Sequence, residues 1–540
     1  MYIYDALRNY PKNRSCGKMG KDDDCDGAGH SGSDFVPLAG LSAQDRSDAL
    51  FRPRGTNLET SSAGVEILAP MVRASTAPLR MLALSYGADL VYTEEIIDRS
   101  ITTCDRIVNE SLGTVDYIRN ISNYSKKVRT RMKAKGEVPV VLRIVPSAER
   151  GRLIYQMGTG EANLALSAAL AVHRDVDGID VNMGCPKKFS VTGGMGSALL
   201  GDPTRACDVI KTLRRNLGGM PVSAKIRLLK DNRSTVDFVR SLVQAGANAI
   251  AIHAREVGDE STQPAKWDRL EEVVKILKGT ESVPIIINGD LYTRDDMVRM
   301  RLRTGADGVM LARPSLYNTS IFKKPITKTA GGDQDETEEG WEDGKYGFDS
   351  PLLEKKPAVI QSYLRYAVQY ASNPKNTKYV LCEMMNNRRT PPKLALRMPQ
   401  IYNGRQTIDG VCQCKTIDEL CQLWNVSLSE ALSGRTHGSG LAWKGDIDEW
   451  FARQVGGTEQ IYDDRYFLDP NGLRKDRESR ERSDTAGSKD KEKKKEVVER
   501  GRDDEQYRED KMTSANSIID YDTRKKDISE YAHTKRARFE

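Results

Sequence analysis

Eight short apolar segments in the middle of the chain constrain its fold more than any other feature. Most of them are separated by segments with the periodicity of amphipathic helices. Strands that are apolar on both faces and alternate with helices form parallel sheets covered by helices. Eight such units over about 250 residues match a closed barrel in number and size. The segments are residues 65–70, 89–94, 152–158, 178–184, 222–228, 249–255, 283–289 and 308–313.

We therefore predict an α/β fold in which a (β/α)8 TIM barrel spans residues 64–325. An open, doubly wound sheet is the alternative, but none of the expected strands is followed by the GxGxxG pattern of that fold. The interval between the second and third expected strands is unusually long. Because it contains the apolar run 138–146, we expect it to form an additional excursion that includes a strand.

Segments of different composition flank the expected barrel. Residues 1–60 are rich in Gly, Ser, Asp and Arg and predict a disordered leader, and residues 455–540 predict a disordered tail of mixed charge. Residues 326–350 are acidic and Gly-rich and predict a linker. Residues 351–453 predict a small helical domain. Its clearest helical signal is an apolar stripe formed by Ile360, Leu364, Ala367 and Val368.

Composition limits the class of protein. The chain has 540 residues, and its net charge of only +6 means that partners have to be inferred from local charge. Nine cysteines without disulfide-like spacing predict a reduced intracellular compartment, and no apolar run reaches the length of a membrane span. We expect a cytoplasmic protein that is a monomer. The basic tail leaves a nuclear location open. The CxC spacing of Cys412 and Cys414 differs from that of common zinc ligands, so we expect no metal site.

The carboxyl ends of the expected strands carry the chemically active residues, and a barrel gathers its active site at those ends. The fourth strand is followed by Cys185, between a glycine and a proline. A thiol at this place suits catalysis, although a single cysteine can also be an inert core residue. The other residues expected at the barrel mouth are Pro70, Met71, Val72, Gln156, Asn182, Lys225, His253, Arg255, Asn288, Gly289, Asp290, Ala312 and Arg313.

Several of these residues favour a phosphorylated cofactor. The loops after the last two strands of a barrel often hold a phosphate, a role that suits the backbone at Gly289 and the side chain of Arg313. Lys225 needs an anionic or carbonyl partner, unless its ammonium group reaches the rim. His253 by itself would be interpreted as a core histidine. Together these groups suit a planar, phosphorylated, redox-active cofactor.

Longer motifs carry a resemblance to a known family. Residues 68–98, residues 177–203 with NMGCPKK and GGMGSALL, and residues 305–318 resemble the flavin-dependent tRNA dihydrouridine synthases. The NMGCPKK to GGMGSALL segment is most similar to the eukaryotic class that modifies uridine 20 of the D-loop. The resemblance runs from about residue 64 to 323 and continues more weakly to about 385, so it covers roughly two thirds of the chain.

The resemblance implies an FMN cofactor that NADPH reduces and that then gives hydride to C6 of a uracil base. Cys185 would donate the proton to C5, a role that needs the thiol and not the thiolate. The flavin ring would be contacted by Pro70, Met71, Val72, Gln156 and Lys225, with His253 nearby. The ribityl phosphate would be held by Asn288, Gly289, Asp290, Ala312 and Arg313.

The implied substrate is tRNA, and its target base has to leave the stack because a folded tRNA cannot enter a barrel mouth. We expect Asn182 and Arg255 to hold the uracil edge. The tRNA backbone would be tracked by basic side chains: Lys187, Lys188, Arg388 and Arg389. A solvated helix face is the alternative interpretation of the last two. Animal members of this class carry a double-stranded-RNA-binding domain, and we expect none here because residues 440–540 lack an αβββα pattern.

Two other functions stay open at this stage. A related flavin barrel could act on a free pyrimidine, although the basic helical region argues against a small substrate. A non-catalytic RNA-binding protein built on a barrel is the second alternative. Such a protein would not need Cys185, Lys225 and His253.

Overall fold

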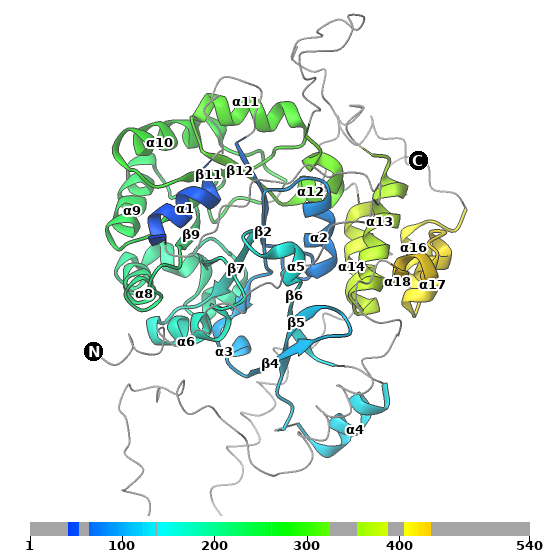
Figure 1. Ribbon diagram of the computed structural model, residues 1–540. Helices are drawn as coiled ribbons and strands as arrows, with labels where there is room; N and C mark the ends of the chain where they lie inside the picture. Colours follow the sequence, from blue (N-terminus) through cyan, green and yellow to red (C-terminus); the bar gives the residue numbers. More distant parts are fainter. Residues whose placement is uncertain are drawn as a thin grey trace, which may run out of the picture. The chain divides into compact units, whose positions relative to one another are not determined.

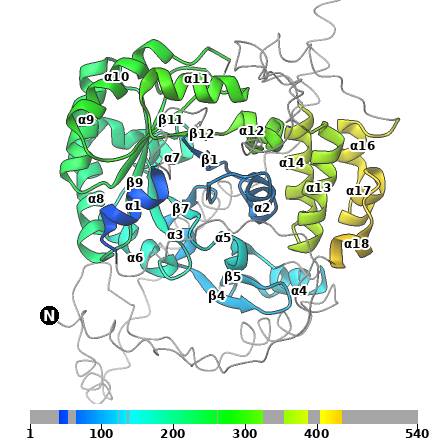
Figure 2. The same ribbon diagram turned by 45° about the horizontal axis from the view of Figure 1, so that its top comes forward.

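The computed structural model describes residues 41–52, 64–122, 124–135, 138–260, 262–324, 354–386 and 404–433. At its centre is a barrel of parallel strands, shown in Figures 1 and 2. The barrel strands are β1 (Val65–Leu68), β2 (Leu90–Tyr92), β7 (Leu153–Gly158), β8 (Gly178–Asn182), β9 (Val222–Arg227), β10 (Ala249–His253), β11 (Ile285–Asn288) and β12 (Gly308–Leu311).

Hydrogen bonds join these eight strands in the order β2-β1-β12-β11-β10-β9-β8-β7, and the pairing of β2 with β7 closes the ring. Each strand lies within one of the eight apolar segments found in the sequence, so the predicted TIM barrel is confirmed. The main helices outside the barrel are α2 (Ala77–Ser85), α6 (Ala162–Val172), α8 (Pro203–Asn216), α9 (Asn232–Gln244), α10 (Trp267–Thr280) and α11 (Arg294–Thr304).

Burial and capping explain why these segments form these elements. All residues of β1, β7, β8, β11 and β12 are buried, as expected for strands packed on both faces. The buried Glu66 of β1 is paired with Arg294 of α11 at 2.7 Å. Thr293 and Asp296 form a capping box at the start of α11, and Gly305 ends it in the left-handed conformation with a φ of 73°.

The long interval between β2 and β7 forms a separate excursion from the barrel. It contains β3 (Ile96–Ile97), α3 (Asp98–Ile101), β4 (Cys104–Asn109), β5 (Thr114–Arg119), α4 (Lys126–Lys135), β6 (Val140–Ile144) and α5 (Pro146–Glu149). Strands β4, β5 and β6 form an antiparallel sheet. The strand expected in residues 138–146 is therefore present.

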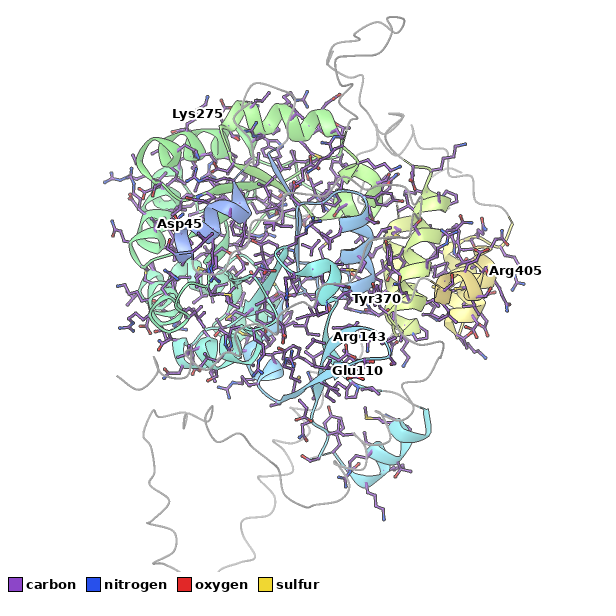
Figure 3. The ribbon with its side chains drawn as sticks, viewed as in Figure 1. Asp45, Glu110, Arg143, Lys275, Tyr370 and Arg405 are labelled. Carbon is purple, nitrogen blue, oxygen red and sulfur yellow. The ribbon has the colours of Figure 1, made fainter. Side chains whose placement is uncertain are left out.

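Helices follow the barrel: α12 (Arg313–Tyr317), α13 (Lys356–Gln369), α14 (Pro374–Met385), α16 (Ile408–Gln413), α17 (Ile417–Leu423) and α18 (Leu428–Ser433). The apolar stripe of α13 is buried, and α13 packs against α2 of the barrel. Arg143 of β6 donates hydrogen bonds to the carbonyl oxygens of Tyr370 and Ala371, just after α13 (Figure 3). The helical region therefore shares a continuous apolar core with the barrel.

One expectation was wrong at the start of the chain. Within the segment predicted to be a disordered leader, residues Ala43–Phe51 form helix α1. Leu50 and Phe51 are buried in the same cluster as Val65 and Ala249, the first residues of β1 and β10. Ser47 Oγ donates to the carbonyl oxygen of Asn248 at 2.8 Å. The helix is too short to show apolar periodicity, and it is stable because it covers the amino-terminal end of the barrel.

Several other expectations lie outside the described residues. They concern residues 1–40 and 53–60 of the leader, the linker at 326–350, residues 434–540, and the segment that carries Arg388 and Arg389. Within the part of the chain that the structure describes, every helix is too short or too polar to cross a membrane.

Candidate active site at the barrel mouth

Cys185 lies in the loop after β8, and its neighbours hold that loop in place. The side-chain oxygen of Asn182 accepts hydrogen bonds from the backbone N–H groups of Gly184, at 2.9 Å, and Cys185, at 3.0 Å. Arg227 of β9 donates to the carbonyl oxygen of Gly184 at 2.8 Å. Asn182, predicted to hold the substrate, therefore also positions the cysteine, because its oxygen is used by this turn.

A polar network runs across the barrel interior below this loop. Gln156 of β7 donates to the Asp180 carboxylate at 2.8 Å, and Ser223 of β9 donates to it at 2.6 Å. The Asn182 amide lies 3.5 Å from the side-chain oxygen of Gln156. Burial raises the pKa of Asp180 to about 6. Gln156 is therefore fixed within this network at the level where the strands end.

Lys225 stands on β9 beside Asn182 of β8 in the strand register. Burial, and next the charge of Arg227, lower the pKa of its ammonium group to about 8. Among the described residues no carboxylate lies within 4.0 Å of this group, whereas the buried guanidinium groups of Arg255 and Arg294 each have such a partner. The mouth therefore presents an ammonium group that is available to a bound anion or carbonyl.

A second group of charges surrounds the ends of β10 and β11. Asp290 accepts from Arg255 at 2.6 Å and from Arg313 at 2.7 Å, so one carboxylate joins two guanidinium groups. Burial, followed by the charges of Lys225, Arg227, Arg255 and Arg313, lowers the pKa of His253 well below its usual value. His253 is therefore neutral at physiological pH, and the surrounding field is positive.

Arg255 is one predicted site residue that the structure does not support in its predicted role. We expected it to hold the uracil edge, but its side chain is buried. Its guanidinium group donates to the carbonyl oxygen of Gln263, at 2.5 and 2.9 Å, and to Asp290, and it lies 3.3 Å from His253 Nε2. These donors are used within the protein, so Arg255 positions Asp290 instead.

The predicted phosphate-binding residues lie together at the ends of β11 and β12. The Asn288 side chain donates to the carbonyl oxygen of Met310 at 2.7 Å, so it fixes the two strand ends to each other. A Cβ on Gly289 would lie 2.6 Å from Trp267 Cζ2, so no larger residue fits there without displacing the ring. Ala312 is the N-cap of the short helix α12, and Arg313 is its first residue.

The loop after β1 forms another side of the mouth. Ser75 holds it, since its hydroxyl donates to the carbonyl oxygen of Ala69 and accepts from the N–H of Met71. Pro70 and Met71 are half-buried, and Val72 is 49% exposed. The loop therefore presents an apolar surface at the mouth, and its contact with a planar ring stays a prediction. Lys187 and Lys188 are exposed shortly after Cys185, where the short helix α7 (Lys188–Thr192) begins.

Glu95 is a site residue that sequence reasoning missed. It lies between β2 and β3, and its Oε1 would be 2.8 Å from a Cβ on Gly158 at the end of β7. Burial raises the pKa of its carboxyl group, which interacts with Cys185, Asn182 and Lys225. Its Oε1 is buried and makes no hydrogen bond within the described structure. The pair Glu94-Glu95 directly after an apolar strand was the signal that could have found it.

The electrostatics around Cys185 favour its protonated form. Burial raises the pKa of the thiol, and the neighbouring carboxylate of Glu95 raises it further. Within the described residues no three His, Cys, Asp or Glu side chains gather in a metal-binding arrangement. The fold and the site thus define a class: a TIM-barrel enzyme in which a protonated thiol and an unpaired ammonium group share the barrel mouth.

Comparison with known proteins identifies the family. The model of the family described as dihydrouridine synthase (Dus) matches residues 67–390, more than half of the chain. The chain therefore belongs to the dihydrouridine synthase family.

Two relatives match over much the same length. The tRNA-dihydrouridine(20) synthase (NAD(P)+) of Schizosaccharomyces pombe is 33% identical over 324 residues, which are 59% of this chain and 59% of that protein. The protein of the same name from Saccharomyces cerevisiae is 33% identical over 329 residues, which are 60% of this chain and 77% of that protein. The chain thus spans about three fifths of the length of the first relative.

Among solved structures, a 2-naphthoyl-CoA reductase in complex with 2-naphthoyl-CoA aligns with a TM-score of 0.34 and 10% identity. The alignment covers 51% of this chain and 52% of that chain. This likeness is too weak to support any argument about the site.

Proposed function

We propose that this protein reduces uridine in tRNA, at position 20, to 5,6-dihydrouridine, with FMN as its cofactor and NADPH as its reductant. The observation that carries the proposal is the protonated Cys185 near Lys225 at the barrel mouth of a dihydrouridine synthase family member. The names of the two relatives support the position, the tRNA and the use of NAD(P). The monomeric state and the cytoplasmic or nuclear location stay predictions.

The residues at the mouth fit FMN. Lys225 lacks an acidic partner among the described residues, so an electron-rich edge of the cofactor would satisfy it. Met71 and Val72 offer an apolar surface for the ring, and Arg313 beside Gly289 suits the phosphate. When bound, FMN supplies the hydride for the uracil base.

The protein itself supplies the proton and the geometry. Cys185 holds a proton on Sγ at neutral pH, because burial and Glu95 raise its pKa. It gives that proton to C5 of the base as hydride reaches C6. Asn182 and Arg227 keep the cysteine loop in place through hydrogen bonds to the backbone of Gly184 and Cys185. This positioning lowers the entropic cost of the transfer.

The substrate has to present a base that has left its stack, and a basic surface has to hold the rest of the tRNA. Lys187 and Lys188 are exposed beside the cysteine. The helical region also borders the mouth, because Arg73, directly after Val72, lies 4.2 Å from the ring centre of Tyr379 in α14. A macromolecular substrate could therefore contact the barrel and the helices at once.

The proposal is tested with purified protein in the absence of oxygen. We expect a flavin absorbance that bleaches with NADPH and returns with unmodified tRNA, but not with orotate or free uridine. Mass mapping of the tRNA product should then locate dihydrouridine at position 20. A protein that takes up no FMN when offered it would contradict the proposal, and reoxidation by a free pyrimidine would favour a small-molecule substrate instead.

A further inference from the structure

We propose that helix α4 is a second contact surface for the phosphate backbone of the tRNA, outside the barrel mouth. The inference rests on the proposed function, because it takes tRNA as the partner. It concerns a part of the excursion to which neither the site nor the sequence motifs gave a role.

The charge of α4 is unusual for this protein. Its ten residues, KKVRTRMKAK, include six Lys or Arg and no Asp or Glu, a charge as large as the +6 of the whole chain. Lys126, Lys127 and Arg131 are exposed, and within the described part of the chain no acidic side chain pairs with them. Unpaired cations on one helix produce a local positive potential that attracts polyanions.

The outer helices of the barrel show the contrast. Their exposed cations are commonly paired with carboxylates, as in Lys275 with Glu271 at 2.7 Å and Arg299 with Asp296 at 2.7 Å. Arg303 of α11 contacts both Asp268 and Glu271 of α10. A basic helix face is therefore not a general property of this surface.

The helix is also held in place by an apolar cluster. Met132 of α4 and Tyr124, just before it, pack with Ile118 of β5 and Ile121. This contact anchors one face of α4 on the excursion and leaves the exposed cations on another. A long ligand therefore meets a fixed array of charges, which reduces the entropic cost of binding.

The excursion that carries α4 leaves the barrel at the carboxyl ends of its strands. Strand β3 pairs with Met157 and Gly158 at the carboxyl end of β7, and α3 follows β3 directly. The end of β5, from which the chain leads to α4, is tied to α3 because Arg119 donates to Ser100 Oγ at 2.7 Å. In Figures 1 and 2, α4 stands out beyond β4 and β5.

This arrangement fits a macromolecular polyanion better than a small one. A tRNA with one base in the mouth continues as a chain of phosphates in both directions, and lysine and arginine bind such phosphates without regard to sequence.

The test compares three variants with the full-length, FMN-loaded protein. The first is the triple substitution Lys126→Gln, Lys127→Gln, Arg131→Gln, and the second exchanges Lys and Arg at the same three positions. The third is a matched control that neutralises Lys211 and Arg215 of α8 and Lys275 of α10, which are exposed on the outer helices of the barrel. The dissociation constant for an unmodified tRNA transcript is measured over a range of salt concentrations.

We expect the α4 triple variant to bind tRNA more weakly. The slope of the log binding constant against log salt concentration (the salt slope) should be shallower by about one for each phosphate that the helix no longer neutralises. The charge-retaining variant and the control should keep the wild-type slope, and NADPH-dependent flavin reduction should be unchanged in all three. A wild-type slope in the α4 triple variant would overturn this inference and leave the proposed function intact. A wild-type protein that neither binds nor reduces tRNA would overturn both.

Discussion

The proton on Cys185 is the critical feature at the scale of single residues. Three neighbouring residues influence this thiol. Asn182 and Arg227 hold the loop that carries Cys185 in place, whereas Glu95 disfavours the thiolate. A thiolate would be a nucleophile, but an acid needs the proton in place before the base arrives. The following two predictions separate the chemical role of the cysteine from the electrostatic role of its neighbour.

Replacing Cys185 with alanine should leave FMN binding and NADPH oxidation intact but reduce uridine reduction by roughly 100-fold or more, because the proton donor is removed. The measurement is stopped-flow flavin reduction followed by reoxidation with tRNA. Cys207→Ala, on α8 outside the mouth, is the matched control and should turn over normally. Normal turnover of the Cys185 variant would exclude its role as the acid.

Replacing Glu95 with glutamine should lower the pKa of the Cys185 thiol. The raised pKa means that the thiol form persists to higher pH than in a free cysteine, and removing the negative charge next to it makes ionisation easier. The thiolate should therefore appear at lower pH in the variant. The rate of iodoacetamide modification at Cys185, followed by peptide mass spectrometry across pH, measures this change.

Glu94→Gln is the control for that experiment. Glu94 is also a carboxylate at the end of β2, but it accepts a hydrogen bond from the backbone of Arg73 and is not among the groups that act on the Cys185 thiol. The Glu94→Gln variant should show the same pH dependence of Cys185 modification as the wild-type protein. Identical profiles for wild-type protein and Glu95→Gln would refute the electrostatic role of Glu95.

Between elements, buried ion pairs join segments that the sequence pattern does not connect. Arg80 of α2 contacts Glu149 of α5 at 2.5 Å, and both side chains are almost fully buried. Arg80 also donates to the carbonyl oxygens of Ser75 and Arg143, and Glu149 accepts from the N–H of Val145. This cluster fixes the end of the excursion against the first helix of the barrel.

Substituting Arg80 with methionine should destabilise the protein by about 3–5 kcal/mol, because an unpaired carboxylate stays buried. The double variant that also replaces Glu149 with methionine should recover part of that stability. Urea unfolding of both variants gives the free energies. As a reference, Arg299→Met at an exposed pair with Asp296 should cost about 0–1 kcal/mol. This role of the ion pair would be contradicted if the Arg80→Met variant were at least as stable as the double variant.

For the whole molecule, the barrel and the helices that follow it share one core. Helix α13 packs on α2, and Leu364 of α13 belongs to the same apolar cluster as Leu79 and Leu82 of the barrel. Tyr370, after α13, packs with Ala77 and Met81. Because the contact is extensive and apolar, we expect these two parts to unfold together.

Leu364→Ala should lower the free energy of unfolding by about 2–5 kcal/mol, since it leaves a cavity in this shared core. Calorimetry should still show one transition for the barrel and its helices, at a lower temperature. Leu302→Ala, at an exposed leucine on α11, should change stability by less than about 0.5 kcal/mol. A separate, earlier transition of the helical region would show that the two parts are independent.

The predictions from sequence succeeded where the physical signal is local. Strands packed on both faces have to be apolar along their length, and the helices between them have to be amphipathic, so the barrel could be found from residue patterns alone. Asn182, Cys185 and Lys225 were expected at one mouth because the carboxyl ends of parallel strands meet there. The structure places all three on the adjacent strands β8 and β9 or directly after them.

The predictions failed where a residue depends on partners far along the chain. A short helix such as α1 has no periodic pattern of its own and is held by the end of the barrel that it covers. Arg255 was assigned to the substrate because its partners, Gln263 and Asp290, could not be known before the loops were placed. The pair Glu94-Glu95 after an apolar strand indicates a carboxylate at the mouth, but the position of Glu95 beside Cys185 depends on how the ends of β2 and β8 are brought together.

The sequence by itself therefore determined the closed barrel, the family and the set of strand ends that make the mouth, because each depends on short-range patterns of apolar and polar residues. Only the tertiary structure decided which of those side chains are free to act and which are used to hold the others. It also decided that the basic helix α4 is anchored on the excursion by an apolar cluster. The reason is that hydrogen-bond partners, burial and electric field depend on which distant segments the closure of the barrel brings together.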